Sequence, residues 1–481
     1  MPVDRYIRAT RDYANRIMIH VFSHYVPARL IVLVVLEALV LMLAAYAGIS
    51  FQSDRSGESV LGMADAAPSL ASGFAVGMLI LMSSMGLYQP ELWSNKPAIA
   101  VRLIVAFLLG FVITGFVAYM VPSLTAGPVV LAGVLVVALT GSVLVRSAFC
   151  KWSHLGAFKS RVLVLGTGSR AVKLGEYAKR NASHKVIGYV ALQPSTHYVP
   201  LEQVLPFEPG ESLLSLVEKH AINQIVVAVR DRRGDGFPVT QLLECKMKGV
   251  DVVELPTFFE REHRQVLLES LNPSWMVLGR GFRQSHLENA VKRLFDLIVS
   301  TAFLLLNLPV MLIVALCIYL ESGAPVLFRQ ERVGQGGRMF TLYKFRSMRM
   351  NAEGDGPPQW ADVNDERLTR VGRVIRKWRI DELPQILNVL RGEMSFVGPR
   401  PERPFFVNRL VTQIPFYALR HTAKPGITGW AQVRYPYGAS IDDAIEKLQY
   451  DLYYVKNHSL FLDVMILIST IEVVIWGKGA R

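Results

Sequence analysis

The sequence predicts a multi-domain membrane protein in which apolar helices precede two folded domains. Three observations favour this class. Hydrophobic residues make up 51% of the 481 residues, and the mean hydropathy is +0.31. Four apolar stretches, each about long enough to cross a ~30 Å hydrocarbon core, precede residue 150. A β-rich run with a glycine turn then follows, which indicates an α/β domain.

The four apolar stretches cover residues 30–49, 69–87, 99–120 and 128–145. We expect them to form a four-helix transmembrane bundle over residues 1–150. The two loops on one side hold a single basic residue, Arg55. Because positively charged flanks stay in the cytoplasm, both ends of the bundle are expected on the cytoplasmic side. The basic residues on that side are Arg5, Arg8, Arg11, Arg16, Arg29, Lys96, Arg102, Arg146, Lys151 and Lys159.

The net charge limits the choice of partner. There are 52 Lys and Arg against 39 Asp and Glu, which gives a formal charge of +13 and favours an anionic partner. In so apolar a chain, lipid headgroups and phosphorylated substrates are favoured and nucleic acid is not expected. The three cysteines form no CxxC pair, so neither a disulfide framework nor a zinc site is predicted. No cleavable signal peptide is expected either.

Residues 151–275 are predicted to form a Rossmann-like α/β domain. The run RVLVLGTGSRA places Gly166 and Gly168 between a strand and a helix, and further strands are expected at 186–190, 225–229 and 250–255. Ala171 replaces the third glycine of the dinucleotide fingerprint, and no carboxylate follows the second strand. A structural or regulatory domain is therefore favoured over a dinucleotide-binding one.

A fifth apolar run covers residues 294–320 and is interrupted by Asn307 and Pro309. Proline removes a helical hydrogen bond, so we expect a break there. Basic residues flank the run on both sides, which favours a re-entrant helix over a straight span. These residues are Arg280, Arg283, Lys292, Arg293, Arg329, Arg332, Arg338 and Lys344. The last apolar stretch, 460–476, is expected to lie at the interface or pack on the domain.

Two adjacent carboxylates, Asp381 and Glu382, precede a helical run in RKWRIDELPQILNVL. One interpretation is structural: Asp381 is an N-cap, with Glu382 and Pro384 in the first turn. The other is chemical, because basic residues crowd the surrounding motifs and would suit a phosphorylated ligand. Those residues are Lys344, Arg346, Arg376, Lys377, Arg400 and Arg403.

The segment 287–475 resembles a known family. The motifs KRxFD, YKFRSM, DELPQ, NVLRGEMSFVGPRP and KPGITGWAQV occur in order, on either side of the broken apolar run. They resemble the bacterial sugar transferases, the monotopic polyprenyl-phosphate glycosyl-1-phosphate transferases, and the whole chain resembles the long-form, exopolysaccharide branch. The resemblance implies that 286–481 is an α/β catalytic domain with a re-entrant membrane helix. It also implies a bacterial inner-membrane homodimer whose two soluble domains are cytoplasmic.

The resemblance further implies a reaction. A sugar-1-phosphate passes from a UDP-sugar to undecaprenyl phosphate, UMP is released, and exopolysaccharide or O-antigen synthesis begins. Asp381 is implied to be the covalent nucleophile, and Glu382 to help hold Mg²⁺. Substrate phosphate binding is expected from four cations: Arg400, Arg376, Lys344 and Arg346. The chain departs from the family pattern around Arg434, so sugar and nucleotide contacts stay unassigned, as does the sugar.

Two alternatives stay open. A membrane-anchored nucleotide-sugar epimerase or dehydratase would use a Tyr-x-x-x-Lys pair, but no tyrosine in this chain has lysine four positions later. A non-catalytic scaffold for polysaccharide assembly would not need the intact Asp381, Glu382 and Arg400 set.

Overall fold

The computed structural model describes residues 18–21, 24–56, 61–89, 96–120, 128–154, 160–180, 184–192, 198–207, 212–229, 237–271, 285–350, 367–435, 438 and 440–476. The chain divides into two compact units, one of residues 1–21, 25–75 and 124–276 and one of residues 22–24, 76–123 and 277–481. Some residues used above for orientation lie outside the described ones: Arg5, Arg8, Arg11, Arg16, Lys159, Arg280 and Arg283.

Short strands β1 (Met18–Val21) and β2 (His24–Pro27) precede the apolar helices. The predicted apolar stretches are helical: α2 (Ala28–Ser56), α3 (Leu61–Ser84), α4 (Lys96–Met120) and α5 (Pro128–His154). Each is long and apolar enough to cross a membrane. The chain is therefore a membrane protein. That the four helices form one bundle stays a prediction.

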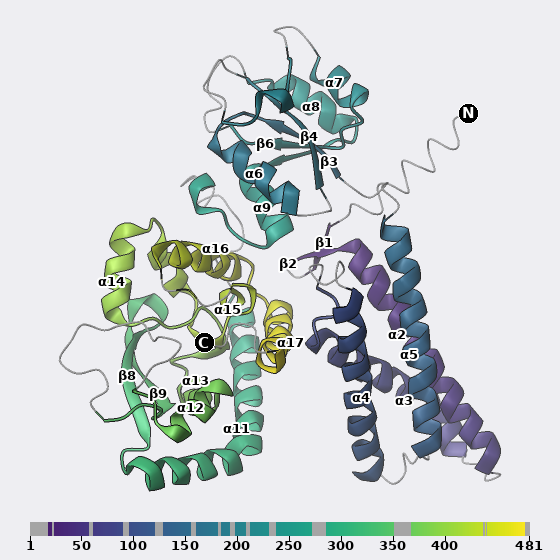
Figure 1. The fold of residues 1–481 in the computed structure, drawn as a ribbon, viewed down its shortest axis with the longest axis vertical. Coiled ribbons are helices and arrows are strands. Elements are labelled where there is room, and N and C mark those ends of the chain that lie inside the picture. The colour runs from purple at the N-terminus through teal and green to yellow at the C-terminus, as the bar shows by residue number, and fades with distance from the viewer. Residues whose placement is uncertain are drawn as a thin grey trace. The chain divides into compact units, whose positions relative to one another are not determined.

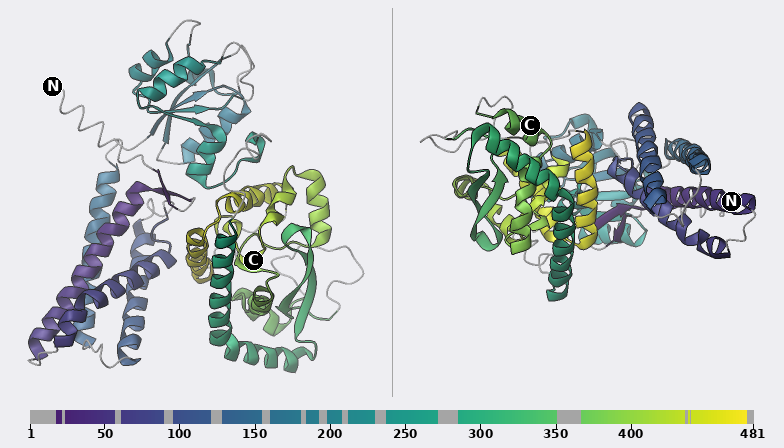
Figure 2. Two further views of the ribbon diagram at one scale, coloured as in Figure 1. Left: turned by 180° about the vertical axis from the view of Figure 1, so that it is seen from behind. Right: turned by 90° about the horizontal axis from the view of Figure 1, so that it is seen from below.

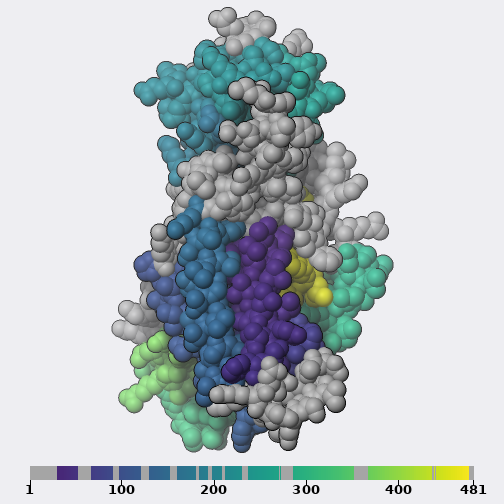
Figure 3. Space-filling model, turned by 90° about the vertical axis from the view of Figure 1, so that its right-hand side faces the viewer, coloured from purple at the N-terminus to yellow at the C-terminus, as the bar shows by residue number. Residues whose placement is uncertain are grey.

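Helices α2 and α5 pack closely in the first unit, side by side in Figure 3. Two glycines permit this approach: a Cβ on Gly141 would come within 2.4 Å of the Val40 side chain, and Gly48 faces Val134 in the same way. Arg146 and Glu37 form a buried ion pair between the helices, with Nε 2.6 Å from Oε1. Pairing is what makes a charge tolerable at such a position.

The middle domain contains strands β3 (Ser160–Leu165), β4 (His184–Val190), β5 (Val204–Leu205), β6 (Gln224–Val227) and β7 (Asp251–Glu254). Its helices are α6 (Ser169–Arg180), α7 (Leu213–Lys219), α8 (Val239–Met247) and α9 (Leu255–His263), with short 3₁₀ turns η3 (Leu201–Gln203) and η4 (Leu268–Ser270). The strands form one parallel sheet in the order β5-β4-β3-β6-β7 (Figure 1).

Both faces of this sheet are covered, as a buried parallel sheet requires. Leu174 of α6 and Phe258 of α9 belong to one apolar core, and Leu216 of α7 and Cys245 of α8 belong to the other. Gly166 ends β3 with φ +115°, a value that favours glycine. The four strands expected from the sequence are present, and the two-residue β5 was missed.

The second unit begins its C-terminal part with α11 (His286–Ser322), a 37-residue helix that turns sharply part-way along (Figures 1 and 2). At ~1.5 Å per residue it is about 55 Å long, more than a membrane core. Pro309 lies inside it, and the Asn307 amide donates to the carbonyl of Phe303 over 2.8 Å. The predicted break is thus a bend within one continuous helix.

Both halves of α11 contact the same folded domain. In the first half, Arg293 donates to the carbonyls of Val389 and Leu390. In the second half, Val314 and Ile318 pack in the domain's apolar core. Because α11 bends, both of its halves pack against this one domain (Figures 1 and 2).

The remaining strands are the antiparallel pair β8 (Leu327–Val333) and β9 (Met339–Phe345) and the parallel pair β10 (Ser395–Val397) and β11 (Gly426–Thr428). The helices are α12 (Arg370–Lys377), α13 (Ile386–Arg391), α14 (Pro404–Gln413), α15 (Trp430–Arg434), α16 (Ile441–Asn457) and α17 (Leu460–Trp476). Three 3₁₀ segments complete the domain: η5 (Gln335–Gly337), η6 (Ile380–Gln385) and η7 (Tyr417–Thr422).

Helix α17 packs on β10, β11 and α15, so the expectation that it packs on the domain is confirmed. It also contacts α4 within the same unit. Arg102 of α4 lies 2.8 Å from Glu472 of α17, and both side chains are almost fully buried. Arg102 donates further to the carbonyl of Met85. One apolar helix is thereby attached to the C-terminal domain through a buried ion pair.

Candidate active site

The carboxylate pair lies in the 3₁₀ segment η6, between α12 and α13. Arg379 is its N-cap and adopts a left-handed conformation, φ +53°, that turns the chain out of α12. Asp381 lies inside the first turn and makes no capping hydrogen bond. The interpretation of Asp381 as an N-cap is therefore wrong, because the helix begins earlier than the sequence pattern indicated.

Glu382 is held by two cations. Its Oε1 atom lies 2.8 Å from Nη2 of Arg400 and 3.2 Å from Nζ of Lys344. Burial would raise the pKa of Glu382, but the positive charges of Arg400 and Lys344 outweigh burial and keep that pKa below its usual range. Glu382 is thus a buried, ionised carboxylate with its charge already compensated.

Asp381 differs sharply from its neighbour. Its side chain is 8% exposed, and within the described part of the chain it has no hydrogen-bond or ion-pair partner. Burial, followed by repulsion from Glu382, raises the pKa of Asp381 to about 6. A position in the first turn of a helix would favour the ionised form, but burial and repulsion from Glu382 outweigh that effect. At neutral pH the group is still mostly ionised, and it is more basic than an ordinary aspartate.

Lys344 is positioned by the contact between β9 and α13. The buried Asn388 of α13 accepts a hydrogen bond from the backbone N–H of Tyr343 and donates one to the carbonyl of Thr341. The Asn388 amide thus makes the two backbone hydrogen bonds that a neighbouring strand would otherwise make with this edge of β9. This fixes the backbone next to Lys344 and directs that lysine toward Glu382. Burial lowers the pKa of Lys344, and the opposing charge of Glu382 raises it in part.

Arg400 lies in the loop that follows β10, and glycines set the path of that loop. A Cβ on Gly398 would lie 2.2 Å from the Lys424 carbonyl oxygen, and one on Gly429 would lie 2.2 Å from the Gly398 carbonyl oxygen. Two backbone segments therefore cross at a distance that only glycine permits. Arg400 therefore follows the crossing at Gly398 by two residues, which restricts its position.

Two arginines that sequence reasoning did not assign to the site hold the carbonyls of this loop. Arg420 donates to the Arg400 carbonyl over 3.0 Å and pairs with the buried Asp451. Arg332 donates to the Pro401 carbonyl over 3.0 Å, and burial lowers its pKa to about 10. Neither residue carries a local sequence signal for this role, because the role depends on tertiary contacts alone.

The other two predicted phosphate ligands have different positions. Arg376 of α12 acts electrostatically on Asp381, opposing the rise in its pKa. Arg346 is buried and donates from Nη2 to the carbonyls of Ser322 and Gly323 at the end of α11. These contacts tie Arg346 to the end of α11, and they give no support to its predicted role as a phosphate ligand.

A protein-built metal cage is not present among the described residues, where no group of three or more His, Cys, Asp or Glu side chains could hold an ion. The carboxylates at this site suit a metal ion that the protein holds only in part. Mg²⁺ commonly takes one or two carboxylates and completes its shell with water and substrate phosphates. Glu382 would provide one such carboxylate.

Comparison with known proteins gives a family. The model of the bacterial sugar transferase family matches residues 287–477. The chain is 37% identical over 392 residues to a UDP-N-acetylgalactosamine-undecaprenyl-phosphate N-acetylgalactosaminephosphotransferase of Aeromonas hydrophila, covering 81% of this chain and 90% of the relative. The chain therefore belongs to the bacterial sugar transferase family and is a transferase.

Two further relatives carry a different sugar in their names. A UDP-glucose:undecaprenyl-phosphate glucose-1-phosphate transferase of Xanthomonas campestris pv. campestris is 33% identical over 337 residues, which is 68% of each chain. An Escherichia coli (strain K12) protein of the same name is 41% identical over 242 residues, 49% of this chain and 52% of that one. The relatives that match this chain therefore differ in the sugar that their names give.

Proposed function

We propose that the protein transfers a sugar-1-phosphate from a UDP-sugar to undecaprenyl phosphate, with Asp381 as covalent nucleophile. The observation that carries the proposal is the contrast within the carboxylate pair. Glu382 is neutralised by Lys344 and Arg400, whereas Asp381 is buried and has no partner among the described residues. A carboxylate kept free beside a fixed cluster of cations suits attack on a phosphorus atom.

In the first step an oxygen of the Asp381 carboxylate attacks the phosphorus that carries the sugar. The bond from that phosphorus to the oxygen bridging to the UMP group breaks, and that oxygen leaves with UMP. The product on the protein is an acyl phosphate bearing the sugar. Lys344 and Arg400 would offset the charge of the diphosphate, because both already face the oxygen of Glu382.

In the second step a phosphate oxygen of undecaprenyl phosphate attacks the same phosphorus. The bond to Asp381 breaks, the carboxylate is restored, and the sugar leaves as a lipid-linked diphosphate. No proton has to be removed from either nucleophile in its ionised form. A pKa of about 6 for Asp381 leaves the attacking form dominant at neutral pH.

We assign Mg²⁺ as cofactor, with Glu382 as its protein donor. When bound, the ion would offset charge on the diphosphate as a Lewis acid. The protein groups do the remaining work. Lys344 and Arg400 hold Glu382 in place, and Arg376 opposes protonation of Asp381.

The membrane assignment follows from the charge pattern and from α11. With both halves of α11 on one domain, the helix would enter and leave the bilayer on the same side, and the basic flanks favour the cytoplasmic side of the bacterial inner membrane. The middle domain, with its doubly covered parallel sheet, fits the Rossmann-like class, and we expect it to have a structural or regulatory role. A homodimer and a role in starting exopolysaccharide or O-antigen synthesis complete the proposal.

The test is release of UMP by the purified protein with Mg²⁺ and undecaprenyl phosphate, over a panel that includes UDP-glucose, UDP-galactose and UDP-N-acetylgalactosamine. Release that depends on one donor and is lost in Asp381→Asn supports the proposal. Equal release by the variant would leave Asp381 as a structural residue. No turnover of any donor would favour a scaffold.

A further inference from the structure

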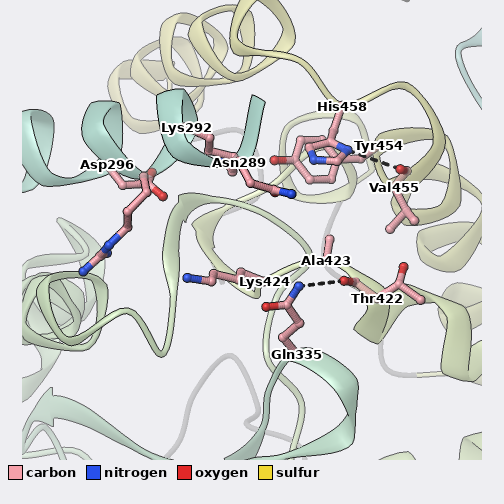
Figure 4. Close-up of a pocket in the computed structure, with 11 residues that line it drawn as sticks. Asn289, Lys292, Asp296, Gln335, Thr422, Ala423, Lys424, Tyr454, Val455 and His458 are labelled. Atoms are coloured by element: carbon pink, nitrogen blue, oxygen red, sulfur yellow. Dashed lines mark hydrogen bonds between the residues drawn. The ribbon is translucent and has the colours of Figure 1, made fainter. Parts of the chain in front are cut away.

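A cavity of about 360 Å³ lies in the C-terminal domain at the first turns of α11. Such a volume falls within the range of small-ligand pockets. Four segments line it: α11, the turn η5, residues 422–424 and the end of α16 (Figure 4). We call it the Lys424 pocket; its polar lining includes Asn289, Lys292, Asp296, Gln335, Lys424 and His458.

The pocket is electropositive. Three cations, Lys292, Arg293 and Lys424, line it; Asp296 is the carboxylate in the lining, and Asp463 pairs with Lys292. Asp296 is committed to the protein, because it accepts hydrogen bonds from the Ser395 hydroxyl and from a backbone N–H. Burial lowers the pKa of His458 to about 4, so that imidazole is neutral and adds no charge.

Lys424 differs from the other two cations of the pocket in its contacts. Lys292 pairs with Asp463, and Arg293 donates to two backbone carbonyls of α13. Within the described part of the chain, the Lys424 ammonium has neither a hydrogen bond nor an ion pair. Burial and then repulsion from Arg293 lower its pKa. A half-buried lysine beside two other cations costs free energy, and a bound anion would relieve that cost.

The neutral lining adds further donors. The side chain of Asn289 reaches into the cavity from α11, opposite Lys424 (Figure 4). The Gln335 amide lies beside Thr422, to whose carbonyl it donates over 3.0 Å. An ammonium and amide N–H groups in the lining of one cavity match the several acceptor oxygens of a phosphate group.

We infer that the Lys424 pocket binds a phosphate group, held by Lys424 and Asn289 within the field of Lys292 and Arg293. The same chemistry is offered by the headgroup of an anionic lipid and by a free phosphate in solution. The pocket lies at the start of a helix whose exposed side chains include apolar ones, Leu287, Leu294 and Ile298 among them, which brings both sources within reach.

This site differs from the one around Asp381, and it does not depend on the proposed reaction. The two share a backbone segment: Lys292 contacts the Val397 carbonyl, and the Lys424 carbonyl packs against Gly398, two residues before Arg400. None of the side chains that line the pocket belongs to the Asp381, Glu382, Lys344 and Arg400 set.

The experiment measures thermal stability of the full-length protein in nanodiscs. To remove phosphate binding near Asp381, all proteins carry Arg400→Gln. This background is compared with the same protein carrying Lys424→Gln, Lys424→Arg or Lys246→Gln. Lys246 is exposed on α8 of the middle domain, so its substitution makes the same charge change away from the pocket. One arm adds inorganic phosphate against chloride of equal ionic strength in phosphatidylcholine discs. The other replaces part of the phosphatidylcholine by phosphatidylglycerol without added phosphate.

The inference predicts that at least one arm raises the Tm of the background protein and that Lys424→Gln loses most of the rise. Lys424→Arg and Lys246→Gln should keep it. A Lys424-dependent rise in the phosphate arm identifies a soluble ligand, and one in the phosphatidylglycerol arm identifies a lipid. If neither arm responds to Lys424→Gln, while that variant melts normally in plain discs, the inference is wrong.

Discussion

Arg400 donates from Nη2 to Oε1 of Glu382 over 2.8 Å, and the same oxygen accepts from Lys344. The adjacent Asp381 is buried and takes part in neither contact. The pair therefore divides into one carboxylate that anchors cations and one that is left free. Environments that push two neighbouring pKa values apart are typical of catalytic acid and base pairs, and here they separate the attacking group from the charge-holding one.

Replacing Asp381 and Glu382 should affect catalysis differently. Asp381→Asn removes the nucleophile and should reduce UMP release by roughly 10³-fold or more. Glu382→Gln leaves the nucleophile but releases Lys344 and Arg400, so we expect a smaller loss with a higher KM for the UDP-sugar. Steady-state kinetics of both variants separate these effects. Equal losses in kcat alone would contradict the division of roles.

The rate should depend on the protonation of Asp381. Only the ionised carboxylate attacks, and its pKa is about 6, so kcat/KM should rise with pH through about 6 and then level off. Because Glu382 contributes to the raised pKa, Glu382→Gln should shift the midpoint to lower pH. A rate that stays constant from about pH 5 to about pH 7 would contradict this account.

The raised pKa of Asp381 also makes the stability of the folded protein depend on pH. The pKa of Asp381 in the folded protein, about 6, lies above the ordinary value of 3.8. The folded state therefore holds the Asp381 proton more tightly than the unfolded state does. The resulting stabilisation of the folded state is full below about pH 4 and is lost as the pH rises through about 6. Asp381→Asn cannot lose a proton, so its Tm should fall less than that of the wild type between about pH 5 and about pH 8. Calorimetry in detergent measures the Tm of both proteins. An equal fall in Tm would contradict the raised pKa of Asp381.

Gly398 should be needed for the position of Arg400. A Cβ there would overlap the Lys424 carbonyl oxygen, so Gly398→Ala must move the loop. A displacement near 1 Å at a reacting site costs roughly 10²-fold in rate, and we expect a loss of that order in UMP release. The matched control is Gly168→Ala, where a Cβ would meet open space. Full activity in Gly398→Ala would show that the crossing does not set the site.

The ion pair between Arg102 and Glu472 should link α4 to the C-terminal domain. Removing one partner leaves a buried, unpaired charge. Arg102→Leu or Glu472→Leu should therefore lower the free energy of unfolding by roughly 3–5 kcal/mol. The double variant should recover much of the loss, because neither charge is then buried alone. A double-variant cycle on thermal stability measures the coupling, and simple additivity would contradict it.

The bend in α11 predicts that both of its ends face the same side of the membrane. In a cysteine-free background, Leu287→Cys and Arg329→Cys should both react with a membrane-impermeant maleimide in inverted inner-membrane vesicles. Neither should react in intact spheroplasts. Labelling of Arg329→Cys from outside would mean a straight span.

The apolar helices and most middle-domain strands could be predicted from the sequence because hydrophobic periodicity is local. The carboxylate pair and Arg400 were found through motifs. The contacts of Arg346 could not be predicted, since its basic neighbourhood in sequence does not reveal that it folds back onto the end of α11. Arg332 and Arg420 were missed because they act through backbone carbonyls that tertiary folding brings to them.

The pKa of Asp381 was also beyond sequence reasoning. A helix start favours an ionised carboxylate, but burial and the charge of Glu382 act in the opposite direction and are larger. Burial depends on packing of α12, η6 and β9, which no local pattern describes.

A covalent bond between Asp381 and the sugar phosphate is tested most directly by the mass of the protein after incubation with its UDP-sugar and no acceptor. We expect added mass equal to one sugar phosphate, located by peptide mapping to Asp381 and discharged by undecaprenyl phosphate. UMP release that proceeds only with acceptor present and leaves no adduct, or an adduct on Glu382 instead, would contradict it.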